Sequence, residues 1–323
     1  MAIEPIPAPP FRRSRAAMWR LRNAESVRTI VIALFANVVI AVAKLIAGIV
    51  SRSTAMLAES AHSFADSLNE ILLAFSLHRA QRPPDPTHPL GHGRERFLWA
   101  LMAAIASFLI GGCFSAGMAI LSLVRGSETG HPLAAWIVLA VSFVADGASW
   151  IQSVRQARHE SRGRGIWNHL VRSSDPVVRA VVVEDTAALI GVLIAAIGLT
   201  ISEITGSGTA DAVASLLIGL LLAVTAFGLA RPLAEFLVGR SLPEEQLKII
   251  RDTITASPAV AEIRSIQAVY TGPEEVIVAA KIRPAEQLNA PELAQAMDDL
   301  DRAIRGASPF VADVYLDLTS IRT

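Results

Sequence analysis

The chain of 323 residues contains a single cysteine, Cys113. One cysteine excludes a disulfide framework within the chain and a cysteine-based zinc knuckle. It lies in an apolar run, where we expect a buried, inert thiol. Charged residues are also scarce, at 18% where a soluble domain carries about 25%. The formal net charge is zero, so no excess of one sign points to a nucleic-acid partner, and none is expected.

The N-terminal segment lacks the apolar core and the cleavage site of a secretory signal peptide. Its prolines predict a disordered start. Its arginines predict contact with lipid headgroups on the cytoplasmic side of a membrane. We therefore interpret residues 1–28 as a basic, partly disordered cytoplasmic N-terminus.

Long apolar runs, by contrast, are abundant. Crossing a hydrocarbon core about 30 Å thick takes about 20 helical residues, and six runs are long enough. Lipid offers the backbone no hydrogen bonds, so each run should be a helix. The predicted spans are Thr29–Val50, Ser53–Leu77, Phe97–Val124, Leu133–Val154, Val177–Ser202 and Gly208–Ala230. Together they predict a six-helix transmembrane domain over residues 29–235.

Arginines predict how this bundle is oriented. They gather in the N-terminal segment and in the loops after the second and fourth spans, whereas the alternate loops hold only Arg52 and Arg125. Cytoplasmic loops carry the excess of positive residues, so both termini should be cytoplasmic. We expect an integral membrane protein, in a bacterial inner membrane.

After Arg240 the pattern changes to that of a small α+β domain, residues 240–323. Helical spacing over 243–257 is followed by two alternating strands, 259–270 and 274–282, then by a helix over 291–305 and a strand over 310–318. The order α-β-β-α-β predicts a cytoplasmic, ferredoxin-like domain. It contains no histidine and no cysteine, so we expect no strong zinc site there.

Four ionisable residues share one face of the second span: Glu59, His62, Asp66 and Glu70. Each costs at least ~2.5–3.5 kcal/mol at bilayer depth, so this stripe should face protein, water or a cation rather than lipid. The i, i+4 pair of His62 and Asp66 presents a nitrogen and an oxygen that suit a divalent metal. Glu59 and Glu70 are candidates for the approach to that site.

The fifth span supplies a second acidic pair at bilayer depth, Glu184 and Asp185. A mixed nitrogen and oxygen set favours zinc or a neighbouring transition metal over calcium or magnesium. The alternatives are a proton pathway, or polar residues that only fix helix packing. Lys44 in the first span should pair with a bundle-facing acid such as Asp146, or act as a gating partner of a glutamate in the stripe.

A second constellation lies between the second and third spans. Asp85, His88 and His92 have the spacing D-x-x-H-x-x-x-H on a loop rich in proline and glycine. Three metal-ligand side chains within eight residues favour a metal site. The alternative is a solvated basic loop in which the histidines are incidental.

The run AESAHSFADSLNE, the loop DPTHPLGHGRERF, the six spans and the α-β-β-α-β tail resemble the cation diffusion facilitator family of zinc transporters. The resemblance covers nearly the whole chain from Thr29 to Leu318. It implies two groups of metal ligands, a transport site and a loop site: His62, Asp66 and Asp185, and Asp85, His88 and His92.

Two features depart from the family pattern. The usual ligand four residues before Asp185 is replaced by Val181. The run VEDTAALIG instead resembles the branch that includes the animal mitochondrial zinc transporter, where an acidic pair takes that place, so Glu184 becomes the candidate for the missing ligand. The histidine-free tail also implies that dimerisation rests on packing alone.

The resemblance implies a homodimeric, proton-coupled exporter of divalent cations. Zinc is the expected transported substrate and a possible ligand of the loop site, with manganese, iron or cobalt as alternatives. A membrane-embedded metal sensor that transports nothing is the competing interpretation. No positioned serine, lysine or cysteine nucleophile signature accompanies these ligands, so we expect no enzyme.

Overall fold

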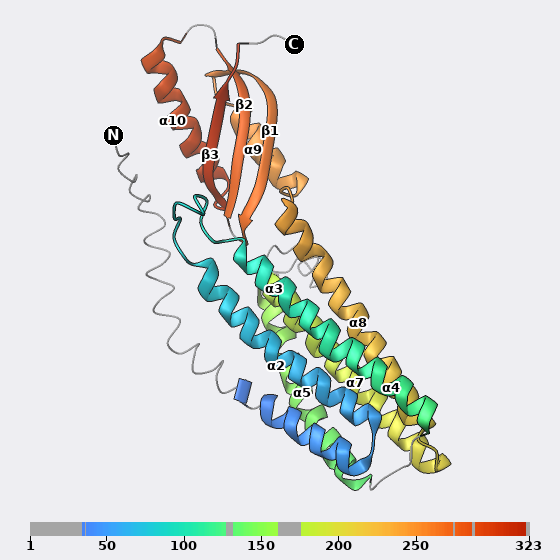
Figure 1. Cartoon of the computed structure of the whole chain (residues 1–323). Coiled ribbons are helices and arrows are strands. Elements are labelled where there is room, and N and C mark those ends of the chain that lie inside the picture. The colour runs from blue at the N-terminus through green and yellow to red at the C-terminus, as the bar shows by residue number, and fades with distance from the viewer. Residues whose placement is uncertain are drawn as a thin grey trace.

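The computed structural model describes residues 34–35, 37–126, 132–160, 176–273, 275–285 and 288–320. The predicted basic N-terminus, residues 1–28, lies outside the described residues. A long helical bundle occupies one end of the molecule and a small α/β unit the other (Figure 1). The predicted mainly helical membrane protein with a small α/β domain is confirmed.

The described helices of the bundle follow the predicted spans. They are an unlabelled first helix, Asn37–Ser51, then α2 (Thr54–Ala80), α3 (Glu95–Ala106), the π-helix η1 (Ser107–Cys113), α4 (Phe114–Arg125), α5 (Leu133–Glu160), α7 (Pro176–Thr205) and α8 (Thr209–Val238).

Four helical stretches are long and apolar enough to cross a membrane by length and composition. They are Glu95–Arg125, Leu133–His159, Ala180–Thr205 and Thr209–Val238. The first of them runs without interruption through α3, η1 and α4. Helix α2 is 27 residues long but carries the ionisable stripe, which lowers its hydropathy. The bundle thus places its polar helix among apolar ones.

Glycine allows η1 and α4 to approach α8 closely. A Cβ atom built on Gly219 would lie 2.8 Å from the backbone nitrogen of Ala116 and 3.0 Å from the backbone oxygen of Gly112. In lipid, helices associate through such backbone contact because the tails are as apolar as leucine. Because lipid tails are apolar, apolar side chains on the outer surface of the bundle also face lipid at no cost. The expected burial of Cys113 is therefore wrong, since its thiol is exposed.

The small domain has the predicted order α-β-β-α-β. Its elements are α9 (Glu244–Thr255), β1 (Val260–Gly272), β2 (Glu275–Pro284), α10 (Ala290–Ala307) and β3 (Val311–Leu318). The sheet order is β1-β2-β3, with β1 and β2 antiparallel and β2 and β3 parallel. Parallel neighbours need a crossover, and α10 provides it. Apolar side chains of both helices pack on the sheet.

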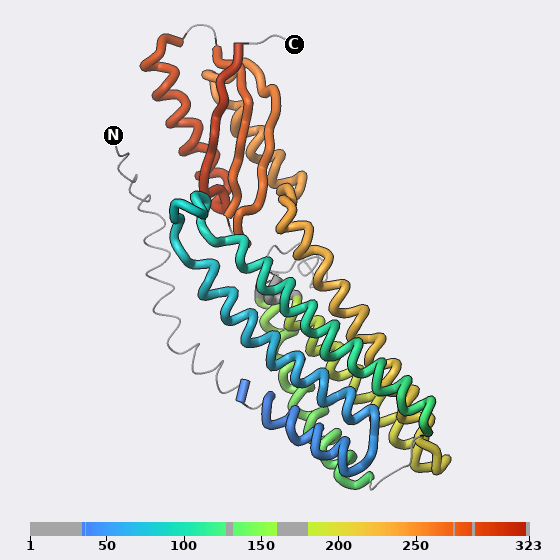
Figure 2. The backbone as a smooth tube through the Cα atoms, viewed as in Figure 1, coloured from blue at the N-terminus to red at the C-terminus, as the bar shows by residue number. Residues whose placement is uncertain are grey.

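The small domain is docked on the bundle rather than merely tethered to it. Figure 2 shows α8 leading from the bundle directly into this domain. The rings of Phe97 in α3 and Phe236 in α8 stack at 4.7 Å, and Phe236 meets Tyr270 of β1 edge-on at 5.3 Å. All three belong to one buried apolar cluster that continues through the small domain. The core therefore crosses the boundary predicted at residues 235–240.

Candidate metal sites in the loop and in the bundle

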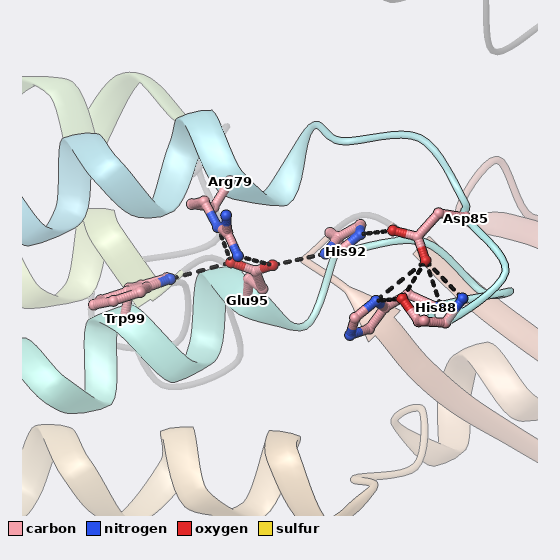
Figure 3. A network of polar contacts seen from close by, with 7 residues as sticks. Arg79, Asp85, His88, His92, Glu95 and Trp99 are labelled. Carbon is pink, nitrogen blue, oxygen red and sulfur yellow. Dashed lines mark hydrogen bonds and ion pairs between the residues drawn. The ribbon is translucent and has the colours of Figure 1, made fainter.

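The loop between α2 and α3 brings Asp85, His88 and His92 together (Figure 3). One ligand atom from each lies within 4.8 Å of the other two. Asp85 Oδ2 is 2.9 Å from His92 Nε2, and Asp85 Oδ1 is 3.3 Å from His88 Nδ1. Backbone hydrogen bonds in both directions between residues 85 and 88 close the turn. The spacing predicted from the sequence thus converges on one point.

His92 is the buried anchor of this loop. Its Nδ1 lies 2.6 Å from Glu95 Oε1, and Glu95 in turn accepts hydrogen bonds from Arg79 Nε at 2.6 Å and Trp99 Nε1 at 3.2 Å. A hydrogen bond from the second ring nitrogen to a carboxylate fixes the orientation of a ligating histidine. The chain of contacts connects the loop to α2 and α3 (Figure 3).

Hydrogen bonds and neighbouring charges in the loop favour the ionised forms of Asp85 and His92. Hydrogen bonds from Thr87 and His92 hold the pKa of Asp85 below its usual range. The carboxylates of Asp85 and Glu95 raise the pKa of His92. Both ring nitrogens of His92 face a carboxylate, so its imidazolium form donates to both. A metal ion at Nε2 would have to displace that proton.

The same loop meets the small domain. A Cβ atom built on Gly93 would lie 2.5 Å from the carbonyl oxygen of Thr271, near the end of β1. Only glycine fits this close approach. The loop that carries the three candidate ligands therefore lies at the junction of the two parts of the molecule (Figure 1).

Within the bundle, His62 and Asp66 face each other on α2 as predicted, with His62 Nδ1 3.4 Å from Asp66 Oδ1. His62 Nε2 and Asp66 Oδ1 are buried and have no hydrogen-bond partner. Buried polar atoms are nearly always paired, so each unpaired one needs an explanation. A bound metal cation would be such an explanation, because it accepts both a histidine nitrogen and a carboxylate oxygen as ligands.

The acidic pair of α7 points to two different neighbours. Glu184 Oε1 accepts a hydrogen bond from Asn69 Nδ2 of α2 at 2.5 Å. Asp185 Oδ1 accepts one from Ser149 Oγ of α5 at 3.1 Å, and its buried Oδ2 has no partner. Each carboxylate thus has one oxygen bonded to a neighbouring helix, and Asp185 Oδ2 is buried without a hydrogen-bond partner.

The predicted transport-site set, His62, Asp66, Glu184 and Asp185, is not gathered as tightly as the loop set. Among the residues the structure describes, the loop residues Asp85, His88 and His92 are the one group of three or more such side chains close enough together to hold a metal ion. Sequence reasoning also missed Asn69, although it lies seven residues after His62 on the same helix. It contacts both Glu184 and Ser107 Oγ, the latter at 2.8 Å at the start of η1.

Lys44 pairs with acids as predicted. Its Nζ lies 3.1 Å from Glu59 Oε2 and 3.7 Å from Asp146 Oδ2. Glu70 is not its partner, because Glu70 Oε1 accepts a hydrogen bond from Asn37 at 2.6 Å. Glu59 is fully buried, so in this conformation it lines no open approach to the site.

The N-terminus of α2 is held by a residue from another span, Asp211 of α8. Its Oδ1 accepts from Ser53 Oγ at 2.6 Å, and its Oδ2 accepts from Thr54 N at 2.5 Å, Thr54 Oγ1 at 2.8 Å and Ala55 N at 3.2 Å. A carboxylate suits the free N–H groups and the positive end of a helix dipole. The helix that carries the stripe is therefore fixed to α8 at its start.

The fold is that of a polytopic membrane protein, and it carries two groups of candidate metal-ligand side chains. Residues 30–238 match the cation efflux transmembrane domain, and the chain belongs to that family, as its motifs predicted. It is 31% identical over 241 residues to the mitochondrial proton-coupled zinc antiporter SLC30A9 of Xenopus laevis, a match that covers 74% of this chain and 43% of that one. The chain thus spans less than half the length of that relative.

Two further relatives broaden the comparison. The chain is 31% identical over 270 residues to metal tolerance protein C4 of Arabidopsis thaliana, covering 81% of this chain and 58% of that one. It is 28% identical over 258 residues to the manganese efflux system protein MneP of Bacillus subtilis, covering 76% of this chain and 80% of that one. The named cargo differs among these relatives.

Proposed function

We propose that this protein exports divalent metal ions, zinc first among them, in exchange for protons. The observation that carries the proposal is a set of buried ligand atoms in the bundle that lack a hydrogen-bond partner: His62 Nε2, Asp66 Oδ1 and Asp185 Oδ2. The similarity to a proton-coupled zinc antiporter supports both the cargo and the exchange. Glu184, held by Asn69, is proposed as a neighbour of the site rather than its fourth ligand.

Proton exchange follows from the chemistry of these groups. Histidine and carboxylate ligands bind metal only when deprotonated, so metal binding releases protons and protonation releases metal. A metal ion entering from the side of the small domain would displace protons from His62 and its carboxylate neighbours. After the helices rearrange, protons entering from the other side would release it. The inward proton gradient would drive export.

Arginine placement supports an orientation with both termini in the cytoplasm, and we propose a bacterial inner membrane as the location. Asp85, His88 and His92 are proposed as a second zinc site. Three ligands there leave one position of a tetrahedral ion for water or another group. We propose a homodimer in which the histidine-free small domains associate by packing.

Manganese is the second candidate cargo. It is favoured by the similarity to MneP, of which the chain covers 80%. Two carboxylates around one histidine also suit a harder ion than zinc. Iron and cobalt remain in the comparison set because affinity order alone does not decide selectivity.

Proteoliposomes loaded with a pH-sensitive dye test the proposal. Zinc added outside should drive a proton flux in the opposite direction, which His62→Ala and Asp185→Ala should each abolish. Manganese, iron and cobalt are compared under the same gradient. Zinc bound without any flux would instead support a metal sensor, and flux retained in either variant would remove that residue from the site.

A further inference from the structure

A buried ion cluster closes the ionisable stripe of α2 at the end away from the small domain. Lys44 Nζ of the first helix contacts Glu59 of α2 at 3.1 Å and Asp146 of α5 at 3.7 Å, and donates a hydrogen bond to Ser63 Oγ at 2.9 Å. Lys44 is 1% exposed and Glu59 is 0% exposed. Charges buried this deeply persist only where they are paired.

Helix α7 forms the fourth wall of this cluster. A Cβ atom built on Gly191 would lie 2.3 Å from Glu59 Oε1, so the carboxylate packs directly against the backbone of α7. Any side chain at position 191 would displace it. Four helices therefore meet at one level, three residues before His62 and about one turn farther from the small domain.

Exposure along the stripe falls toward this level. Asp66 is 25% exposed, His62 3% and Glu59 0%. Exposure therefore decreases along the stripe from Asp66 toward Lys44 and Glu59, the end away from the small domain. A metal ion at His62 and Asp66 would add positive charge about one turn from the ammonium group of Lys44. The repulsion between the two charges favours movement of Lys44 away from the site.

We propose that the Lys44–Glu59 pair is the gate that closes the metal path on the side away from the small domain. Lys44 is a positioning residue here: it binds no metal, and it holds the first helix, α2 and α5 together until it separates from Glu59. The inference rests on the proposed transport function. A permanent staple between helices, which never opens, is the alternative that the test separates from it.

Side-specific cysteine labelling tests the gate. In a Cys113→Ser background, Ala55→Cys places a reporter on α2 four residues before Glu59, at a position that is fully buried. Ala74→Cys places a matched reporter four residues after Glu70, toward the small domain. Sealed vesicles of both orientations are treated with a membrane-impermeant thiol reagent. The closed gate predicts labelling of Ala74→Cys from the small-domain side and none of Ala55→Cys from the opposite side.

Saturating zinc and removal of the ammonium should both open the gate. Labelling of the Ala55→Cys reporter from the opposite side should rise at least about tenfold in Lys44→Gln, because breaking a buried ion pair is strongly unfavourable to the closed state. It should rise in the wild-type background when zinc and a proton gradient are supplied. Lys44→Arg, which keeps the charge, should preserve the zinc-free protection.

A third reporter, Ala119→Cys, is fully buried in α4 away from the cluster and reports general loosening. Equal labelling of Ala55→Cys and Ala119→Cys in Lys44→Gln would mean unfolding and would overturn the gate. If Ala55→Cys is never labelled while zinc flux is intact, the Lys44–Glu59 pair is a permanent contact between helices, and the gate is also overturned. Labelling needs no transport, so opening without any metal flux would contradict the proposed function and not the gate.

Discussion

Replacing Asp211 should destabilise the N-terminus of α2, because that residue accepts most of the hydrogen bonds there. The carboxylate accepts four hydrogen bonds from three consecutive residues, two of them from backbone N–H groups of α2. A hydrogen bond to a charged group contributes about 1.5–3 kcal/mol, and a side-chain helix cap about 0.5–2 kcal/mol. Ser53 Oγ still accepts from Met56 N, so one cap survives the substitution.

We therefore expect Asp211→Ala to lower the free energy of unfolding by about 3 kcal/mol, which is less than the sum of the four bonds because neighbouring contributions do not add. Asp211→Asn keeps the size and one acceptor oxygen, and should lose about half as much. Reversible unfolding in mixed detergent micelles measures both. Asp252→Ala, at an exposed position in α9, is the matched control and should change the free energy by no more than about 0.5 kcal/mol. A loss for Asp211→Ala as small as that of the control would refute the proposed capping role.

Two further substitutions test the assignment of ligands. Asp185→Asn should weaken zinc binding in the bundle at least about tenfold, because it removes a charged ligand. Glu184→Gln should change it less than about threefold, since Asn69 already donates to Oε1 of that carboxylate. Isothermal titration in detergent compares the two variants, and the reverse ranking would make Glu184 the ligand. Asp85→Asn should reduce zinc flux in proteoliposomes without abolishing it and remove zinc from the loop; complete loss of flux would place the loop in the transport step itself.

Much of the fold could be predicted from the sequence because the forces involved are local. Helix periodicity and the absence of water partners in lipid predict the spans, and alternation predicts the three strands. The loop set was predictable for the same reason, since Asp85, His88 and His92 lie within eight residues and one tight turn brings them together.

The contacts between elements could not be read from periodicity. The hydrogen bonds of Glu184 and Asp185 come from Asn69 and Ser149, which lie on two other helices. The cap that Asp211 provides to α2 joins residues more than 150 positions apart. Docking of the small domain likewise rests on Phe236, whose hydrophobic character in the sequence is the same as that of any lipid-facing residue. The expectation that Cys113 is buried was wrong for the same reason: an apolar neighbourhood in the sequence does not distinguish the bundle interior from its lipid-facing surface.

The most direct test of the bundle site is the zinc it retains when the loop site is removed. X-ray absorption at the zinc edge, on a variant with Asp85, His88 and His92 all replaced by alanine, reports the remaining ligands. We predict one bound zinc per chain with a single histidine nitrogen and carboxylate oxygens at about 2.0–2.2 Å. Further replacement of His62 by alanine should remove the nitrogen signal. No retained zinc, or a site with several imidazoles, would contradict a transport site built on His62, Asp66 and Asp185.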